Sequence, residues 1–342
     1  MSRKKGWKIY VPPQKQQRGS KMFTVHDIFE KTSQMMRDVY CETLMEMAQK
    51  NEDIVVLDAD LVSSSGMKPF YKKFPERAIN CGIAEANMIG IAAGLSVMGK
   101  VPFAHSFGCF ASRRACDQIM ISAAYSKQNV RIIGSDPGVT AAYNGGTHMP
   151  FEDMGVLRSI PGITLIEPTD PVMLADILKQ LETLHGVYYL RMLRKHATAV
   201  YREGSKFEIG RGNMLKSGSD VTIISSGIMV AESLKAVDIL SAEGISARVV
   251  DMFTWKPIDT EMIGYCARTT GAIVTAENHN VIGGLGSAVA EAVVQTIPVP
   301  IEMVGVKDRF GQVGTEDFLR KEYNLTPEAI VDAAKRAVAR KS

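Results

Sequence analysis

Four side chains in this sequence have types and surroundings that suit chemistry: Glu85, Phe107, Phe110 and His148. Glu85 opens an Ala/Gly-rich helical segment with apolar neighbours, where a carboxyl group can share a proton with a ligand nitrogen. Contact with the helix dipole alone is the alternative role of this residue. The two phenylalanines, three residues apart, either hold a planar heterocycle or pack in the core. His148 ends a long loop of small residues, where an imidazole can act as a general acid or base, or simply face solvent.

A further glycine-rich stretch, residues 283–287, precedes a predicted helix and could hold a phosphate at the helix start. It lacks the G-x-G-x-x-G spacing, and no P-loop lysine follows it. The stretch therefore predicts a tight turn between a strand and a helix. The five cysteines form no C-x-x-C pair, so we predict reduced thiols in a cytoplasmic protein and no metal site in this chain.

The elements that position these residues alternate between short apolar runs and amphipathic helices, which predicts an α/β fold with parallel sheets covered on both faces. Predicted strands include residues 54–57, 130–133, 164–166, 187–190, 220–224, 247–252, 271–276 and 301–306. Predicted helices include residues 37–50, 84–98, 111–126, 171–184, 230–240, 259–268 and 286–297, and a last helix capped by Thr326 with Pro327 at its first position.

The chain of 342 residues is long enough for about two domains of ordinary size. We predict a basic N-terminal extension over residues 1–35, a first domain over 36–198 and a second over 205–342. Residues 1–21 carry seven Lys/Arg and no Asp/Glu, while the rest of the chain is mildly acidic. No run of 18 apolar residues occurs, so we expect no membrane span. One short basic segment is weak evidence for nucleic-acid binding, so we expect none.

The chemistry-bearing residues belong to motifs with a fixed order along the chain: Asp58-Ala-Asp-Leu61, Asn80-Cys-Gly-Ile-Ala-Glu85, Ser106-Phe-Gly-Cys-Phe110 and Gly146-Thr-His148. This ordered set resembles the C-terminal half of transketolase, and the resemblance runs from about residue 36 to the end. It implies a pyrimidine-binding domain followed by a transketolase C-terminal domain. It also implies thiamine diphosphate and Mg²⁺ as cofactors, and transfer of a two-carbon ketol unit between sugar phosphates.

The resemblance implies a role for each residue of the cofactor site. Glu85 would hydrogen-bond ring nitrogen N1′ of the aminopyrimidine, which promotes removal of the thiazolium C2 proton. Phe107 and Phe110 would stack on the pyrimidine. Asp60 would lie near the positively charged thiazolium, and His148 would stabilise the developing oxyanion of the donor substrate.

The resemblance also implies contacts with a sugar phosphate through Arg37, Ser64 and Arg191. One departure bears on the substrate. Many transketolases have an acidic pair before the Gly-x-x-His element, whereas this chain has Tyr143 and Asn144 there. Asn144 can still hydrogen-bond a sugar hydroxyl, but without a charge. An unusual acceptor, such as a branched sugar phosphate, follows as a hypothesis.

The sequence has no Gly-Asp-Gly motif with a later Asn, the element that holds Mg²⁺ and the diphosphate in this family. The resemblance therefore implies one subunit of a split transketolase, with those ligands on an N-terminal partner subunit. Because such cofactor sites lie between protomers, a heterotetramer of two copies each is expected. A β subunit of a 2-oxo acid dehydrogenase E1 component and a non-catalytic paralogue are the alternatives.

Overall fold

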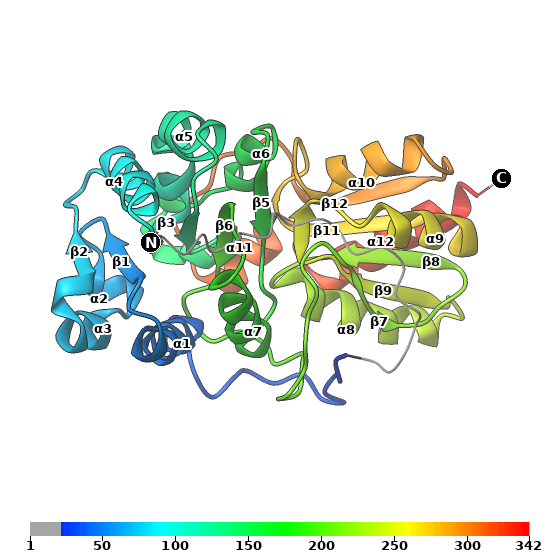
Figure 1. Cartoon of the computed structure of the whole chain (residues 1–342). Coiled ribbons are helices and arrows are strands. Elements are labelled where there is room, and N and C mark those ends of the chain that lie inside the picture. Colours follow the sequence, from blue (N-terminus) through cyan, green and yellow to red (C-terminus); the bar gives the residue numbers. More distant parts are fainter. Residues whose placement is uncertain (1–21, 342) are drawn as a thin grey trace.

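Two sheets lie side by side in the computed structural model, which describes residues 22–341, and helices cover both faces of each (Figure 1). The seven-stranded sheet has the order β10-β5-β6-β4-β3-β1-β2, and the five-stranded sheet has the order β12-β11-β8-β9-β7. The strands are β1 (Ile54–Asp58), β2 (Ala78–Asn80), β3 (Val101–Phe107), β4 (Val130–Ser135), β5 (Ile163–Ile166), β6 (Val187–Met192), β7 (Asn213–Lys216), β8 (Val221–Ser225), β9 (Ala247–Asp251), β10 (Thr254–Lys256), β11 (Ile273–Asn280) and β12 (Ile301–Val306).

The helices between these strands confirm the predicted α/β alternation. They are α1 (Met36–Lys50), α2 (Val62–Ser65), α3 (Lys68–Lys73), α4 (Glu85–Val97), α5 (Cys116–Gln118), α6 (Asp153–Arg158), α7 (Pro171–Leu181), α8 (Met229–Ala242), α9 (Thr260–Thr270), α10 (Leu285–Val294), α11 (Glu316–Glu322) and α12 (Pro327–Ala339). Short 3₁₀ segments include η4 (Gly138–Asn144) and η5 (Gly146–His148). No helix within residues 22–341 is both long and apolar enough to cross a membrane.

Two hydrophobic cores run across both sheets, one on each face. Residues of α1, α7, α8 and α12 belong to one core, and residues of α4, α6, α9 and α10 belong to the other. Strands β1, β4, β6, β8 and β9 are buried along their whole length, as expected for strands covered on both sides. Each core therefore ties the two sheets into one body.

The edge strands depart from the parallel pattern. Strand β10 follows β9 in the chain but pairs antiparallel with β5 of the first sheet, and β7 pairs antiparallel with β9. The first sheet thus takes one edge strand from the predicted second domain. The ranges 36–198 and 205–342 remain a prediction from sequence, and the sheets cross that division at β10.

Helix boundaries follow the predicted capping signals where those signals are local. The Thr326 side chain accepts a hydrogen bond from the backbone N–H of Ala329, and Pro327 opens α12, as predicted. Helix α4 begins at Glu85, and Gly99 after it adopts the predicted left-handed conformation with φ of 84°. The sequence signals therefore locate the start of α4, on which the cofactor hypothesis depends.

The predicted helix over residues 111–126 is interrupted. Its two ends, Phe110–Arg114 and Ile119–Tyr125, are π-helical. The preceding segment is itself strand β3, so Phe107 ends a strand and Phe110 begins a helical turn. Wide π-helical turns are frequent at functional sites because they re-aim side chains along a helix.

Part of the predicted N-terminal extension is described. Residues 22–35 form isolated antiparallel bridges, Val25 with Tyr201 and Lys31 with Thr198, and otherwise contain no strand or helix. This segment runs beside the connection between the two sheets. The basic residues 1–21 lie outside the described residues.

Candidate functional site

Glu85 is a buried carboxylate with two defined partners. Its side chain is 1% exposed at the start of α4. The Ser106 hydroxyl on β3 donates to Glu85 Oε1 at 2.9 Å, and Arg114 Nη1 donates to Oε2 at 2.7 Å. Because the Arg114 side chain is 44% exposed, one partner of Glu85 is fixed in the core and the other reaches in from the surface.

Three rings gather beside this carboxylate. The ring centroids of Phe107 and Phe110 are 6.3 Å apart, and His148 lies edge-on to both, at 5.8 and 5.1 Å. The Arg114 guanidinium carbon lies 3.9 Å from the Phe110 ring centroid. Arg114 therefore links the carboxylate of Glu85 to the aromatic group. The sequence predicted the four residues Glu85, Phe107, Phe110 and His148, and they lie within reach of one another through these contacts.

The loop that carries His148 is held by the second domain. Asn278 on β11 accepts a hydrogen bond from Val139 N at 3.0 Å and donates to the Pro137 carbonyl at 2.8 Å. At Gly146 an added Cβ would lie 2.3 Å from the carbonyl oxygen of Gly311, so only glycine allows this approach. The C-terminal domain thus positions a residue of the candidate site.

The loop after β1 carries Asp60 on the exposed side and Asp58 on the buried side. Asp60 has a φ of 62° and accepts a hydrogen bond from Asn80 Nδ2 at 3.0 Å. Asp58 accepts hydrogen bonds from Leu61 N and the Ser65 hydroxyl, and burial raises its pKa to about 6. Asp58 stabilises the loop from its buried side, whereas the carboxylate of Asp60 is exposed and can contact a ligand.

A cluster of cations lies where α1, β4 and β6 meet. Arg37 Nη1 and Arg194 Nη1 each lie 3.5 Å from the Ser64 carbonyl oxygen. Asp136, which follows β4, is 1% exposed and lies 2.8 Å from Arg194 Nη2. The structure therefore brings the predicted residues Arg37 and Ser64 together, and adds Arg194 and Asp136, which the sequence analysis missed.

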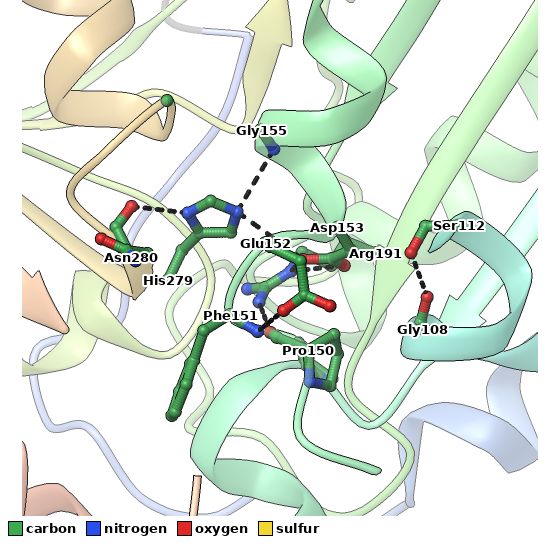
Figure 2. A network of polar contacts seen from close by, with 12 residues as sticks. Gly108, Ser112, Pro150, Phe151, Glu152, Asp153, Gly155, Arg191, His279 and Asn280 are labelled. Atoms are coloured by element: carbon green, nitrogen blue, oxygen red, sulfur yellow. Dashed lines mark hydrogen bonds and ion pairs between the residues drawn. The ribbon is translucent and has the colours of Figure 1, made fainter. Parts of the chain in front are cut away.

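The prediction that Arg191 contacts a phosphate is wrong. Arg191 is 0% exposed, and each of its nitrogens is engaged. Nε donates to Asp153, and Nη2 donates to the carbonyl oxygen of Pro150 (Figure 2). Nη1 donates to Glu167 at 2.7 Å, and Nη2 also donates to the carbonyl oxygen of Asn278. The family resemblance implied a phosphate contact for Arg191, but the carboxylates that surround its guanidinium come from distant parts of the chain.

The same buried network uses His279 and Glu277 of β11. His279 Nδ1 donates to the Asn280 carbonyl, and Nε2 accepts from Gly155 N at 3.2 Å, which fits a neutral ring (Figure 2). Burial lowers the pKa of His279 to about 4. Glu277 accepts from the backbone N–H groups of Leu285 and Gly286 at the start of α10. The carboxyl group of Glu277 therefore occupies the backbone N–H groups at the glycine-rich turn, which fits a structural turn and leaves these donors unavailable to a phosphate.

Tyr143 and Asn144 lie on the exposed end of η4, and Tyr143 is 71% exposed. Two cavities of about 600 and 570 Å³ lie elsewhere, around the connection between the sheets, and are not lined by Glu85, His148 or Arg37. Because Asp60, Tyr143 and Asn144 are exposed, the candidate site lies at the surface of this chain. Among residues 22–341, no three His, Cys, Asp or Glu residues are grouped in a way that could hold a metal ion.

Comparison with known families identifies both halves of the chain. A family model described as the transketolase pyrimidine-binding domain matches residues 32–198, and one described as the transketolase C-terminal domain matches residues 210–330. The chain belongs to the transketolase family. The pyrimidine-binding domain implies thiamine diphosphate as the cofactor of this transketolase chain.

Several relatives are single subunits. The chain is 50% identical over 307 residues to the 6-deoxy-6-sulfo-D-fructose transketolase subunit SqwH of Clostridium sp. (strain MSTE9), which covers 90% of this chain and 95% of that protein. It is 36% identical to one subunit of the apulose-4-phosphate transketolase of Phocaeicola vulgatus, over 87% of this chain and 96% of that protein. In contrast, it spans 49% of the transketolase of Rattus norvegicus, at 35% identity.

A solved structure supports the same assignment. A split-gene transketolase, described as an inactive beta4 tetramer, superimposes with a TM-score of 0.84 and 45% identity, over 90% of this chain and 99% of that one. The chain is therefore a C-terminal subunit of a two-chain transketolase, which implies an N-terminal partner subunit.

Proposed function

We propose that this chain binds the aminopyrimidine half of thiamine diphosphate through Glu85, and that together with its partner it transfers a two-carbon ketol unit between anionic sugars. One observation carries the proposal. The buried carboxylate of Glu85, whose cationic partner Arg114 reaches it from a 44% exposed side chain, lies next to the rings of Phe107 and Phe110, in a domain of the pyrimidine-binding family. A carboxyl group in this place can form a hydrogen bond with a ring nitrogen of a ligand.

The described residues fit the cofactor's ring. The cofactor, when bound, supplies the carbon nucleophile of ketol transfer. Glu85 holds a proton at a ring nitrogen, while the Ser106 hydroxyl fixes the orientation of the carboxylate. The ring nitrogen competes with Arg114 for the second carboxylate oxygen, and the exposed Arg114 side chain can turn toward solvent. Asp60 supplies a negative charge on the exposed side, toward the thiazolium. We assign the Mg²⁺ and diphosphate ligands to the partner subunit.

His148 and Asn144 act on the substrate in this proposal. The His148 ring is turned edge-on against Phe107 and Phe110, with its Nδ1 2.9 Å from the Thr147 hydroxyl, which leaves Nε2 for the substrate. A ring nitrogen here can donate to an oxygen on which negative charge develops. The exposed amide of Asn144 offers an uncharged hydrogen bond to a sugar hydroxyl.

The charged end of the sugar binds at Arg37, Ser64 and Arg194 in this proposal. Guanidinium groups bind anions in a planar, bidentate way, and two of them converge on one carbonyl oxygen here. Two relatives among the split transketolases are named for different sugars, a sulfofructose and apulose 4-phosphate. Together with Tyr143 and Asn144 in place of an acidic pair, this supports a sugar other than the common pentose phosphates.

We propose a heterotetramer of two copies of each subunit, located in the cytoplasm. Exposed apolar side chains on and beside α4 and on the neighbouring π-helical turn are available for a subunit contact: Ile83, Val97, Met98, Met120, Ile121 and Tyr125. Exposed apolar groups gathered in this way are typical of interaction surfaces. All five cysteines are free, as expected for a reducing compartment.

The test begins with co-expression of this chain and an N-terminal-type transketolase subunit carrying the Gly-Asp-Gly element. Native mass spectrometry should show two copies of each chain, and ketol transfer should require both. The chain alone should bind thiamine diphosphate weakly and show no transfer. A complex that binds the cofactor but transfers no ketol unit, with any of a panel of ketose donors, would contradict the proposed activity.

Glu85→Gln tests the role of the carboxylate. General acid–base groups contribute about 10²–10⁴-fold to turnover, so the variant complex should lose at least about 100-fold in kcat. Its cofactor affinity, measured by calorimetry, should fall much less. Glu261→Gln on the 76% exposed side chain of α9 is the matched control and should leave both values unchanged. Equal losses of turnover and affinity in Glu85→Gln would count against a role in proton placement.

A further inference from the structure

One anionic side chain lies inside the cationic cluster. Asp136 follows β4 directly, and Arg194 follows β6, the neighbouring parallel strand. Arg194 Nε donates to Asp136 Oδ1 at 3.1 Å, and Nη2 lies 2.8 Å from Oδ2. The Nε/Nη2 side of the guanidinium, one of the sides that can hold two oxygens of a ligand, is therefore already taken by a carboxylate.

The remaining donors of Arg37 and Arg194 make only long contacts with the protein or none. Arg37 Nε is buried without a hydrogen-bond partner in the described part of the chain, and its nearest carboxylate oxygen, Asp38 Oδ1, is 3.7 Å away. The Nη1 atoms of Arg37 and Arg194 reach the Ser64 carbonyl only at 3.5 Å, the long limit for a hydrogen bond. Buried polar groups are normally satisfied, so these donors point to a ligand that supplies oxygens.

The charges of the cluster nearly cancel. Burial raises the pKa of Asp136, and the cations Arg194, Lys195 and Arg37 act against that rise; Asp136 and Asp38 are the carboxylates beside them. His105, which also faces Arg194, is buried, and burial lowers its pKa to about 3, so it is neutral. Three cations and two carboxylates leave one net positive charge. A phosphate ester carries roughly 1.5–2 negative charges at neutral pH, whereas a sulfonate carries one.

Asp136 is also held in an uncommon backbone conformation. Its φ is 58°, in the left-handed region, where Asp and Asn are enriched among residues other than glycine. Strained residues of this kind persist where the surroundings fix them, and they gather at functional sites. The position therefore accepts asparagine in place of aspartate, which removes the charge and keeps the shape.

We propose that Asp136 determines head-group specificity: by occupying the fork of Arg194 with a buried negative charge, it makes the cluster favour a sugar with a monoanionic end, such as a sulfonate, over one with a phosphate. This inference rests on the proposed function, because it concerns the substrate of the same site. A second negative charge on the ligand lies close to the Asp136 carboxylate in a poorly solvated place. Like charges brought together at such a site weaken binding strongly.

The test uses the assembled two-subunit enzyme and two ketoses that differ only at C6, one with a phosphate ester and one with a sulfonate. The wild-type complex should have the higher kcat/KM for the sulfonate. Asp136→Asn should move the ratio of the two values at least about tenfold toward the phosphate, mainly through KM. Asp27→Asn, which removes the same charge from a 91% exposed position outside the cluster, should move the ratio less than about twofold.

Two results would overturn the proposal: a wild-type preference for the phosphate, and an unchanged ratio in Asp136→Asn. The wild-type comparison decides the matter even if the variant fails to fold. Calorimetric binding of the same two ketoses to the complex separates this inference from the proposed function. Tighter binding of the sulfonate without any ketol transfer would support the role of Asp136 and contradict the proposed activity.

Discussion

Arg191 and Arg194 are three residues apart at the end of the same strand, and their surroundings are opposite. Arg191 is completely buried, and two carboxylates and two carbonyl oxygens accept hydrogen bonds from its nitrogens. Figure 2 shows the contacts with Asp153 and Pro150. Arg194 is 16% exposed, shares one carboxylate, and reaches its remaining acceptor only at 3.5 Å. The first cluster is closed by the protein, and the second is left open.

The difference shows how a structural ion cluster is told from a binding site. Residues from both sheets close the Arg191 cluster, since Asp153 and Glu167 come from the first half of the chain and Asn278 from β11. Such a network orients the two sheets, and it has no free donor for a ligand. In the open cluster, Arg37 Nε has no hydrogen-bond partner within residues 22–341, and the Asp38 carboxylate is 3.7 Å away. The comparison predicts that changes in the closed cluster affect folding and changes in the open cluster affect binding.

The largest effect is expected for Arg191→Met. The substitution leaves the buried carboxylates of Asp153 and Glu167 without their cation, which typically costs about 3–5 kcal/mol of unfolding free energy. Urea unfolding of the chain measures this loss. Arg37→Met is the control, because its partner Asp38 is 48% exposed and such pairs are worth less than about 1 kcal/mol. Similar losses in the two variants would remove the distinction between closed and open clusters.

The pH dependence of stability tests the closed cluster next. Burial raises the pKa of Glu277 to about 8, from about 4.5 in the unfolded chain. Between these values the folded protein holds one more proton than the unfolded protein, so stability falls as pH rises. Glu277→Gln removes this contribution. The unfolding free energy of the wild type should therefore fall more steeply between pH 5 and 8, by roughly 1 kcal/mol per pH unit relative to the variant.

Other buried acids affect both proteins equally. Burial also raises the pKa of Asp251 to about 7, and this residue is retained in the variant. Its contribution cancels when the two pH profiles are subtracted. A difference between the profiles that is flat from pH 5 to 8 would show that Glu277 does not hold its proton in the folded protein.

The closed and open clusters also mark what the sequence could predict. Apolar runs, helix caps and motif order are local features, and they located α4, the cap at Thr326 and the residues Glu85, Phe107, Phe110 and His148. They could not separate Arg191 from Arg194. Both arginines follow the apolar run of residues 187–190. The carboxylates that distinguish them, Asp153 beside Arg191 and Asp136 beside Arg194, belong to other elements and are close only in space.

Two features of the fold were missed for the same reason. Strand β10 is three residues long and pairs with β5, almost 90 residues earlier, so no local pattern assigns it to the first sheet. The π-helical turns of residues 110–125 retain a helical pattern of side chains, and the sequence predicted an ordinary helix there. Pairing across long separations and small changes in helical winding depend on tertiary packing.

Arg37→Met should affect binding through the open cluster. The loss of a hydrogen bond to a charged group is worth about 1.5–3 kcal/mol, so KM for an anionic ketose should rise at least about tenfold with kcat little changed. Steady-state kinetics of the two-subunit enzyme measure both. A ketose with an uncharged end is the control substrate, and its KM should be the same in variant and wild type. A fall in kcat with both substrates would mean that Arg37 supports the structure of the site instead.

The smallest effect is expected for Ser106, a buried residue whose hydrogen bond to Glu85 lies inside the candidate cofactor site. Ser106 is 0% exposed, and its hydroxyl donates to Glu85 Oε1, the carboxylate expected to meet the cofactor. Ser106→Ala removes one neutral donor, and such bonds contribute about 0.5–1.5 kcal/mol. Thiamine diphosphate should bind the two-subunit enzyme roughly 2–10-fold more weakly by calorimetry. If the unfolding free energy falls and the cofactor affinity does not, Ser106 has a structural role only. Arg114 and the start of α4 would then be enough to hold Glu85 in place for the cofactor.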